Sequence, residues 1–449
     1  MYEACRMQSA SNQPMSSSSP EIRPDTNIPP ETEAAPTTRQ PLDYLTSPKE
    51  GWFRALRHDE FRVFWGGNFA SNIGTWMQNV AQGWLVLQIT NSPFWLGMVG
   101  FAQQVPALLF SLPGGVVADR TNRRTLLFTT QSVMTVLALA MAVLTSLEWI
   151  TVGRVAAIAF LAGTTMAINA PSYQAAVRDL VTREDTLNAI ALNSIQFNTS
   201  RVLGPSLAGF VIAGFNIEMC FYLNALSYVP LLWVISRTKF PPMEQRQERS
   251  MRADLVEGFH YVWQHRTILL LISIVAIVSM FGLPYLVMMP EFARNVLKVG
   301  PKGLGYLVAA AGLGALLGGV HLASLKPERR RGPLVLSSTF LFFAAVILFC
   351  FSRDPRISAV LIGIAGGTAV NSVATINSLV QNYVPDEFRG RVLSMHTMAF
   401  LGFTPLGSLL IGTLAEGIGA PLAMAASAGF ALTLTALIAL FAADLRKLQ

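Results

Sequence analysis

The sequence contains little charge for its length. Of its 449 residues, 13% are Asp, Glu, Lys or Arg, about half the share usual in soluble domains, whereas 52% are hydrophobic. Apolar runs of about 20 residues or more recur along the chain, each long enough to cross a bilayer as a helix. The runs are continuous and do not alternate with polar residues, which excludes a β-barrel. We therefore predict an all-α polytopic membrane protein.

Cysteine and the usual catalytic motifs are also scarce. Cys5, Cys220 and Cys350 have neither disulfide nor metal-ligand spacing, so we expect no metal and no cofactor. The sequence has no Gly-rich nucleotide loop and no nucleophile elbow at a membrane interface. These absences argue against an enzyme and against an ATP-driven pump. No cleavable signal sequence precedes the first apolar run, so that run is expected to direct membrane insertion.

The net charge of +7 has to be judged together with its distribution. In a soluble chain a pI near 9.5 would suggest nucleic acid as a partner. Here Lys and Arg concentrate in alternate links between the apolar runs, as the positive-inside rule predicts for cytoplasmic links. The expected partner is the lipid bilayer, and no nucleic acid is expected.

Twelve spans can be drawn from the apolar runs. They cover residues 61–89, 94–117, 125–147, 152–176, 188–213 and 217–236, then 267–290, 303–324, 333–352, 356–381, 392–416 and 421–443. We predict a six-helix bundle over 49–236, a cytoplasmic linker over 237–266 and a second six-helix bundle over 267–449. An even number of spans places both termini in the cytoplasm. Residues 1–48, rich in Ser, Pro and Thr, are expected to form a disordered cytoplasmic tail.

The two predicted bundles resemble each other at an offset near 203 residues. The charged turn that begins at Val181 corresponds to the turn that begins at Val384. At the same offset, Gly204 and Gly209 correspond to Gly407 and Gly412. A parallel six-helix repeat is typical of carriers whose binding site lies between the two halves.

One short hydrophilic stretch separates the second and third apolar runs. It reads Gly115-Val-Val-Ala-Asp119-Arg120-Thr-Asn-Arg123-Arg124. Alone, a basic turn between two spans is a topology signal. This pattern resembles the loop signature between helices two and three of the major facilitator superfamily. With the twelve spans and the repeat, the resemblance extends over roughly residues 56–445. The second half lacks the equivalent of Asp119 and keeps only an arginine cluster, Arg329 to Arg331.

Four further stretches resemble one branch of that superfamily, the enterobactin-exporter-like (transmembrane secretion effector) branch. They are Phe61-Arg62-Val-Phe-Trp65, Gly74-Thr75-Trp76-Met77-Gln78, Asn198-Thr-Ser-Arg201-Val-Leu-Gly204-Pro205 and Val384-Pro385-Asp386-Glu387-Phe-Arg389-Gly390-Arg391. The resemblance implies a monomeric secondary active exporter in the inner membrane, with the proton as the expected coupling ion. Its small-molecule cargo would be a siderophore, secondary metabolite or drug, moved by alternating access. An importer and a non-transporting receptor or scaffold on the same fold are the alternatives.

By the same resemblance, the hydrophilic stretch is a conformational latch between the halves. Asp119 would pair with a helix N-terminus or an arginine, and Arg120, Arg123 and Arg124 with acidic partners. Gly115 would allow close helix packing. The alternative is that the cationic residues only mark topology.

Gly204, Pro205 and Gly209 resemble the antiporter-type motif of the superfamily. A proline bends a helix because it removes a backbone donor, and a glycine allows another helix to approach closely. By family analogy this motif is a flexible, leak-sealing element of exporters. A plain packing kink is the alternative.

Arg201 lies about 20 Å into the predicted fifth span, near the bilayer midplane. A cation at that depth is costly unless it faces a partner or a water-filled cavity. Two interpretations remain open. Arg201 could bind carbonyl or amide groups of a neighbouring helix, or it could contact an acidic cargo such as a catecholate.

Polar residues share one face on several predicted spans, where they must point toward a cavity or another helix. We predict that they line a substrate cavity together with Arg201, the alternative being adhesion between helices. The predicted residues are Asn72, Thr75, Asn79, Gln196, Asn371 and Thr375. No Asp or Glu falls at mid-depth in any predicted span, so a proton carrier is not evident. The weak candidates are Glu291, Glu416, His321 and His396.

Overall fold

The computed structural model describes residue 51 and residues 53–238, 240, 251–325, 330–441 and 448. The predicted tail over 1–48 and part of the predicted linker lie outside the described residues. From Phe53 on, the chain forms one compact unit. Throughout the described part of the chain the regular structure is helical.

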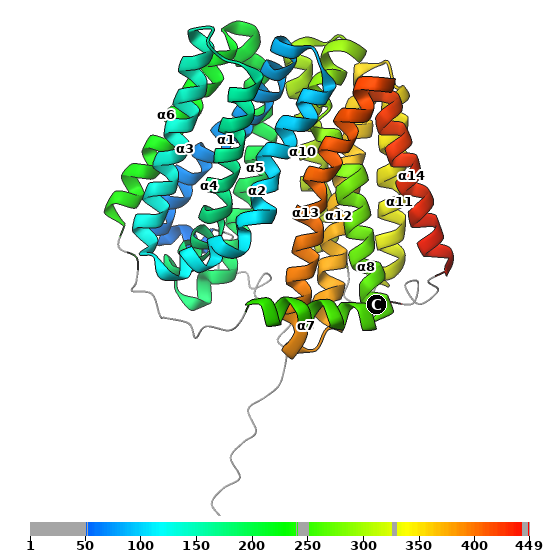
Figure 1. Cartoon of the computed structure of the whole chain (residues 1–449). Helices are drawn as coiled ribbons and strands as arrows, with labels where there is room; N and C mark the ends of the chain where they lie inside the picture. The colour runs from blue at the N-terminus through cyan, green and yellow to red at the C-terminus, as the bar shows by residue number, and fades with distance from the viewer. Residues whose placement is uncertain are drawn as a thin grey trace, which may run out of the picture. The chain divides into compact units, whose positions relative to one another are not determined.

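The first half consists of six long helices (Figure 1). They are α1 (Asp59–Thr90), α2 (Pro93–Arg120), α3 (Arg123–Ser146), α4 (Val152–Asp179), α5 (Thr186–Gly214) and α6 (Ile217–Arg237). Local sequence signals set several of their ends. Asn122, for example, accepts hydrogen bonds from the backbone N–H groups of Arg124 and Thr125, which satisfies two donors at the start of α3. Short 3₁₀ turns, η2 (Arg54–Arg57) and η3 (Arg183–Asp185), precede α1 and α5.

The second half begins with an interrupted span. Helix α8 (Arg266–Ile277) continues through the π-helical η4 (Val278–Gly282), the 3₁₀ turn η5 (Leu283–Leu286), α9 (Met289–Glu291) and the π-helical η6 (Phe292–Val296). Pro284 and Pro290 lack backbone donors, which explains why a regular helix does not persist here. The apolar segment therefore extends from Arg266 to Val296, beyond the predicted 267–290. The remaining helices are α10 (Gly300–Ser324), α11 (Arg331–Phe351), α12 (Pro355–Tyr383), α13 (Asp386–Ile418) and α14 (Ala420–Phe441).

The predicted linker contains a helix that its polar composition did not reveal. Helix α7 (Met251–Gln264) runs crosswise to the long helices (Figure 1) and packs against the start of α13. The Tyr261 ring stacks on Phe388 with 4.6 Å between centroids, and Arg391 Nη1 lies 3.1 Å from Glu257 Oε1. The segment is thus an amphipathic helix that is fixed to the second half.

Ten helical segments in the described chain are long and apolar enough to cross a membrane. The two other predicted spans coincide with α1 and α5, which are 32 and 29 residues long but more polar. These two helices carry predicted polar faces. Helix α1 packs against α2, α4, α5 and α6, so much of its surface faces other helices.

The predicted repeat is visible in the helix contacts. Gly204 of α5 packs on α1, the first helix of the first half. Gly407 of α13 packs on Met280, in the first span of the second half, which is its own half. Gly209 contacts α10 in the opposite half, and Gly412 contacts α2 in the opposite half. Residues separated by 203 positions therefore have equivalent partners.

Candidate transport site between the two halves

The two halves meet where α2 crosses α13 and where α5 crosses α10. A Cβ on Gly97 would lie 2.5 Å from the Ser408 carbonyl oxygen and 2.8 Å from Gly412 Cα. In the second crossing, a Cβ on Gly209 would lie 2.9 Å from the Pro301 carbonyl oxygen. Only glycine permits such backbone contact. We call the end of the molecule with these crossings and the α1–α2 link the closed end.

The opposite end, which we call the basic end, carries the α2–α3 link. Here Arg123 and Arg124 contact groups of their own half. Arg123 pairs with Asp179 at the end of α4, and Arg124 donates to the Ser236 carbonyl at the end of α6. Asp119 is exposed. Arg123 and Arg124 therefore do not connect the halves in this conformation.

The close packing predicted at Gly115 is not formed in this conformation. A Cβ on Gly115 would meet no atom within 4 Å, whereas one on Gly114 would lie 2.9 Å from the Ala167 carbonyl oxygen. The close approach between α2 and α4 thus occurs one residue earlier. A shift of one residue turns a helix face by about 100°, which sequence spacing alone does not resolve.

The predicted antiporter-type motif lies where α5 contacts two helices at once. Gly204, Pro205 and Gly209 are all buried. A Cβ on Gly204 would lie 2.5 Å from Trp76 Cβ on α1, while the Pro205 carbonyl and Gly209 face α10. The motif therefore contributes both to packing inside the first half and to the contact between halves.

Arg201 lies midway along α5, at the seam between the halves. A Cβ on Gly312, midway along α10, would lie 2.9 Å from the Arg201 carbonyl oxygen. The half-buried guanidinium stands 5.7 Å from the centre of the Trp76 ring, which itself packs edge-on against Phe197. Within the described residues Arg201 forms no ion pair, and its side chain makes no hydrogen bond. The guanidinium therefore contacts an aromatic ring, that of Trp76, through a cation–π interaction.

The predicted polar face of α1 contacts neighbouring helices of its own half. Thr75 Oγ1 lies 2.9 Å from the Tyr228 hydroxyl on α6, and Gln103 on α2 donates to Asn79 Oδ1 at 3.0 Å. Asn72 is half-buried and forms no side-chain hydrogen bond in the described part of the chain. Sequence spacing identified this face, but it could not identify the partners Tyr228 and Gln103.

The other predicted cavity residues are covered by helices in this conformation. Gln196 is 1% exposed and neither of its amide atoms has a hydrogen-bond partner. Asn371 Nδ2 lies 3.4 Å from His321 Nδ1 on α10, and Thr375 is fully buried. These residues therefore do not lie on an open surface here.

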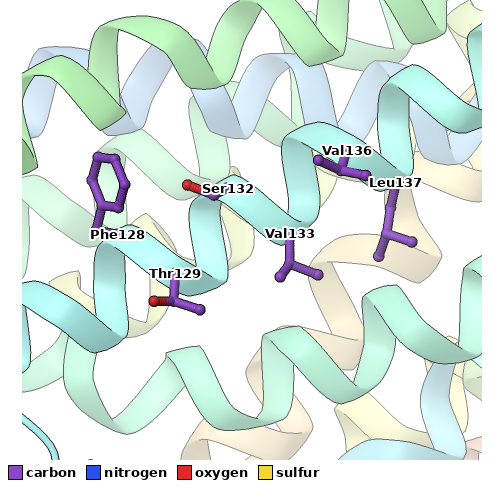
Figure 2. Close-up of a pocket in the computed structure, with 6 residues that line it drawn as sticks. All are labelled: Phe128, Thr129, Ser132, Val133, Val136 and Leu137. Atoms are coloured by element: carbon purple, nitrogen blue, oxygen red, sulfur yellow. The ribbon is translucent and has the colours of Figure 1, made fainter.

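A surface depression on α3 is not the predicted site. Its lining comes from one helix, as Figure 2 shows: Phe128, Thr129, Ser132, Val133, Val136 and Leu137. Mainly apolar side chains of successive turns, several of them well exposed, are typical of a lipid-facing surface. None of the predicted site residues takes part.

The segment before α1 is fixed to the start of α5 by an Asp185 cluster, formed by Arg54, His58 and Asp185. Arg54 pairs with the Asp185 carboxylate, and His58 Nε2 lies 2.7 Å from Asp185 Oδ2. Burial raises the pKa of Asp185, but hydrogen bonds from His58 and Arg54, with the Arg54 charge, outweigh it and leave the pKa below its usual value.

Replacement of Asp185 by asparagine is expected to lower the free energy of unfolding by about 1–3 kcal/mol, because it removes the carboxylate charge that accepts hydrogen bonds from Arg54 and contacts His58. Since the folded-state pKa is lowered, this stabilisation is fully present above about pH 4 and is lost below it, as pH falls through the lowered pKa. Thermal unfolding in detergent from pH 7 to about pH 2.5 measures the difference and covers the window in which it should disappear.

Asp59→Asn is the matched control, because the Asp59–Arg62 pair is exposed and should contribute little. The same series in a His58→Gln background separates the contribution of the contact between His58 and Asp185. Equal stability of Asp185→Asn and Asp59→Asn would contradict the role of the cluster.

A family model described as transmembrane secretion effector matches residues 50–449. The chain belongs to this family of the major facilitator superfamily. It is a multi-pass membrane transporter of the inner (plasma) membrane and not an enzyme.

Relatives of the transporter have named cargos. It is 26% identical over 361 residues to the staphyloferrin A transporter of Staphylococcus aureus, covering 80% of this chain and 90% of the relative. It is 23% identical over 410 residues to the enterobactin exporter EntS of Shigella flexneri, covering 89% and 97%.

Two solved transporter structures have a fold similar to that of this chain. The inward-facing, unoccupied structure of a bacterial homologue of the human lysosomal transporter Spinster has a TM-score of 0.65, 14% identity and coverage of 87% of this chain and 96% of that one. The nucleoside transporter NupG has a TM-score of 0.69, 12% identity and coverage of 85% and 99%. At these identities the likeness concerns the fold alone.

Proposed function

We propose that this transporter exports an acidic, siderophore-like small molecule by alternating access. In this proposal α1 and α5 cross the membrane with the ten more apolar segments, which gives twelve spans and two cytoplasmic termini. The basic end faces the cytoplasm, because Lys and Arg concentrate in its links. The conformation described above is then open toward the cytoplasm and closed toward the exterior.

Arg201 carries the proposal about cargo. It is a cation midway along a membrane helix, at the seam between halves, and its recorded partner is an aromatic ring rather than a carboxylate. Such a cation is stabilised when an anion occupies the site. Two relatives are named for siderophores, enterobactin and staphyloferrin A. An anionic chelating metabolite therefore fits the site better than a neutral or cationic one.

The latch and the polar faces belong to later steps of the same cycle. We place the pairing of Asp119 and Arg120 across the halves in the state closed at the basic end. Asn72 and Arg201 are half-buried now, and Gln196, Asn371 and Thr375 would gain exposure as the helices tilt. The proton remains the proposed coupling ion. His396, which is 5% exposed with no partner at Nε2, is a candidate carrier among the described residues.

Inverted membrane vesicles under an imposed pH gradient test the function. The two cargos compared are a catecholate siderophore and a hydrophobic cationic dye. Gradient-dependent accumulation of the siderophore supports export of an acidic cargo with proton coupling. Accumulation of the dye alone would favour a multidrug exporter. Uptake only into right-side-out vesicles would identify an importer, and absence of both fluxes would favour a receptor or scaffold.

A further inference from the structure

Glu416, near the end of α13, contacts the start of α2 in the opposite half. Its Oε2 atom accepts a hydrogen bond from Ser92 Oγ at 2.7 Å and from the Phe94 backbone N–H at 3.2 Å. The Gly97–Gly412 crossing, about one turn away on both helices, brings the two backbones close enough for these bonds. The carboxylate therefore bridges the halves at the closed end.

The start of α2 depends on this carboxylate for a hydrogen-bond partner. Ser92 is the N-cap residue, and its side chain does not cap its own helix. Pro93 follows at the first helical position and has no N–H, so Phe94 provides the first backbone donor. That donor is satisfied by Glu416 from α13. A negative charge at a helix N-terminus is also favoured by the helix dipole.

Serine is among the residues that most often cap their own helix, through a bond from the hydroxyl oxygen to a free N–H of the first turn. Here the Ser92 hydroxyl donates to Glu416 instead of accepting from α2. If the halves separated at this end, Glu416 would withdraw and the N–H of Phe94 would lose its partner. Ser92 could then rotate to accept it. Both states of the end would be capped, by different groups.

We propose that Glu416 is a positioning residue that stabilises the closed end by capping α2 from the opposite half, and that Ser92 takes over this cap when the end opens. The proposal rests on the alternating access proposed above. It assigns one capping residue of α2 to each state: Glu416 when the end is closed, and Ser92 when the end is open. Loss of Glu416 should favour the open state, and loss of Ser92 in addition should oppose it.

The labelling rate of a single cysteine at Ser408 measures how often this end opens. Ser408 is fully buried at the α2–α13 crossing, where Gln104 donates to its hydroxyl at 3.3 Å. Ser408→Cys is introduced into a variant whose three native cysteines are replaced and whose membrane abundance is verified. A membrane-impermeant maleimide is added from the outer face without cargo, so the measurement does not require flux.

Glu416→Gln is expected to raise the labelling rate about two- to fivefold, the range for loss of one charge at a helix N-terminus. Glu416→Ala removes the acceptor too and should raise it at least as much. Glu148→Gln is the matched control, because Glu148 lies in the α3–α4 link and forms no ion pair in the described part of the chain. Equal rates for Glu416→Gln and Glu148→Gln would overturn the proposal.

The exchange of caps is tested by a second substitution in the Glu416→Ala background, where the closed state no longer contains the bond from Ser92 to residue 416. Ser92→Ala should lower the labelling rate from the raised value, because the open state loses its cap, whereas Ser92→Thr should leave it raised. A further increase with Ser92→Ala would overturn the exchange. Absence of labelling in every variant, with normal abundance, would show that this end does not open, and would overturn alternating access as well.

Discussion

Arg201→Ala is expected to reduce transport of an anionic siderophore about 30-fold or more at unchanged membrane abundance, the range for removal of one partner from a desolvated charge contact. The reason is the position of Arg201. It lies at the middle of α5, where α5 meets the middle of α10, and its guanidinium contacts the Trp76 ring. An acidic cargo would supply the negative charge that the described protein does not place there.

Arg201→Lys should keep part of the activity, because it retains the charge but loses the planar group that pairs with two oxygens at once. Arg356→Ala is the control, since Arg356 is an exposed cation at the start of α12. Initial rates of siderophore and cationic dye uptake are compared in the same vesicles. If Arg201→Ala transports the siderophore at the wild-type rate, the residue does not contact the cargo. Equal loss of both cargos would assign it a structural role.

Gly412→Leu is expected to abolish most transport because the halves could no longer touch at the closed end. Even a Cβ at Gly412 would lie 2.8 Å from Gly97 Cα, and a larger side chain has no space at a backbone contact. Overpacking of a tight contact costs about 1–3 kcal/mol, which shifts a two-state equilibrium by roughly 5- to 150-fold. The protein should then accumulate in the state open at this end.

Gly417→Leu provides a matched control on the same helix. A Cβ at Gly417 would meet no atom within 4 Å. Both substitutions therefore change helix propensity by the same amount, and only Gly412→Leu also disrupts a contact with α2. Transport rate is measured with labelling of the Ser408→Cys reporter described above. Normal transport by Gly412→Leu would contradict the need for close approach of α2 and α13. Loss of membrane abundance in Gly412→Leu alone would indicate a folding defect, which Gly412→Ala then tests at lower steric cost.

Several features of this protein follow from local sequence alone. The helix predicted over 152–176 is observed as Val152–Asp179, because a continuous apolar run satisfies its own backbone only as a helix in lipid. The family also follows from short stretches such as the hydrophilic turn after Gly115. The offset of 203 residues predicted equivalent roles for Gly209 and Gly412, and both lie at crossings between the halves.

Only the tertiary structure shows which side chains contact one another. Spacing placed Thr75 and Asn79 on one face of a helix, but only packing shows that Thr75 contacts Tyr228 and Asn79 contacts Gln103. Close packing was expected at Gly115 and is found at Gly114. The role of Glu416 was also hidden, since its bonds to Ser92 and Phe94 join residues more than 300 positions apart. Hydropathy and helical period are local properties of the chain, whereas the choice of a partner depends on how distant helices tilt and cross.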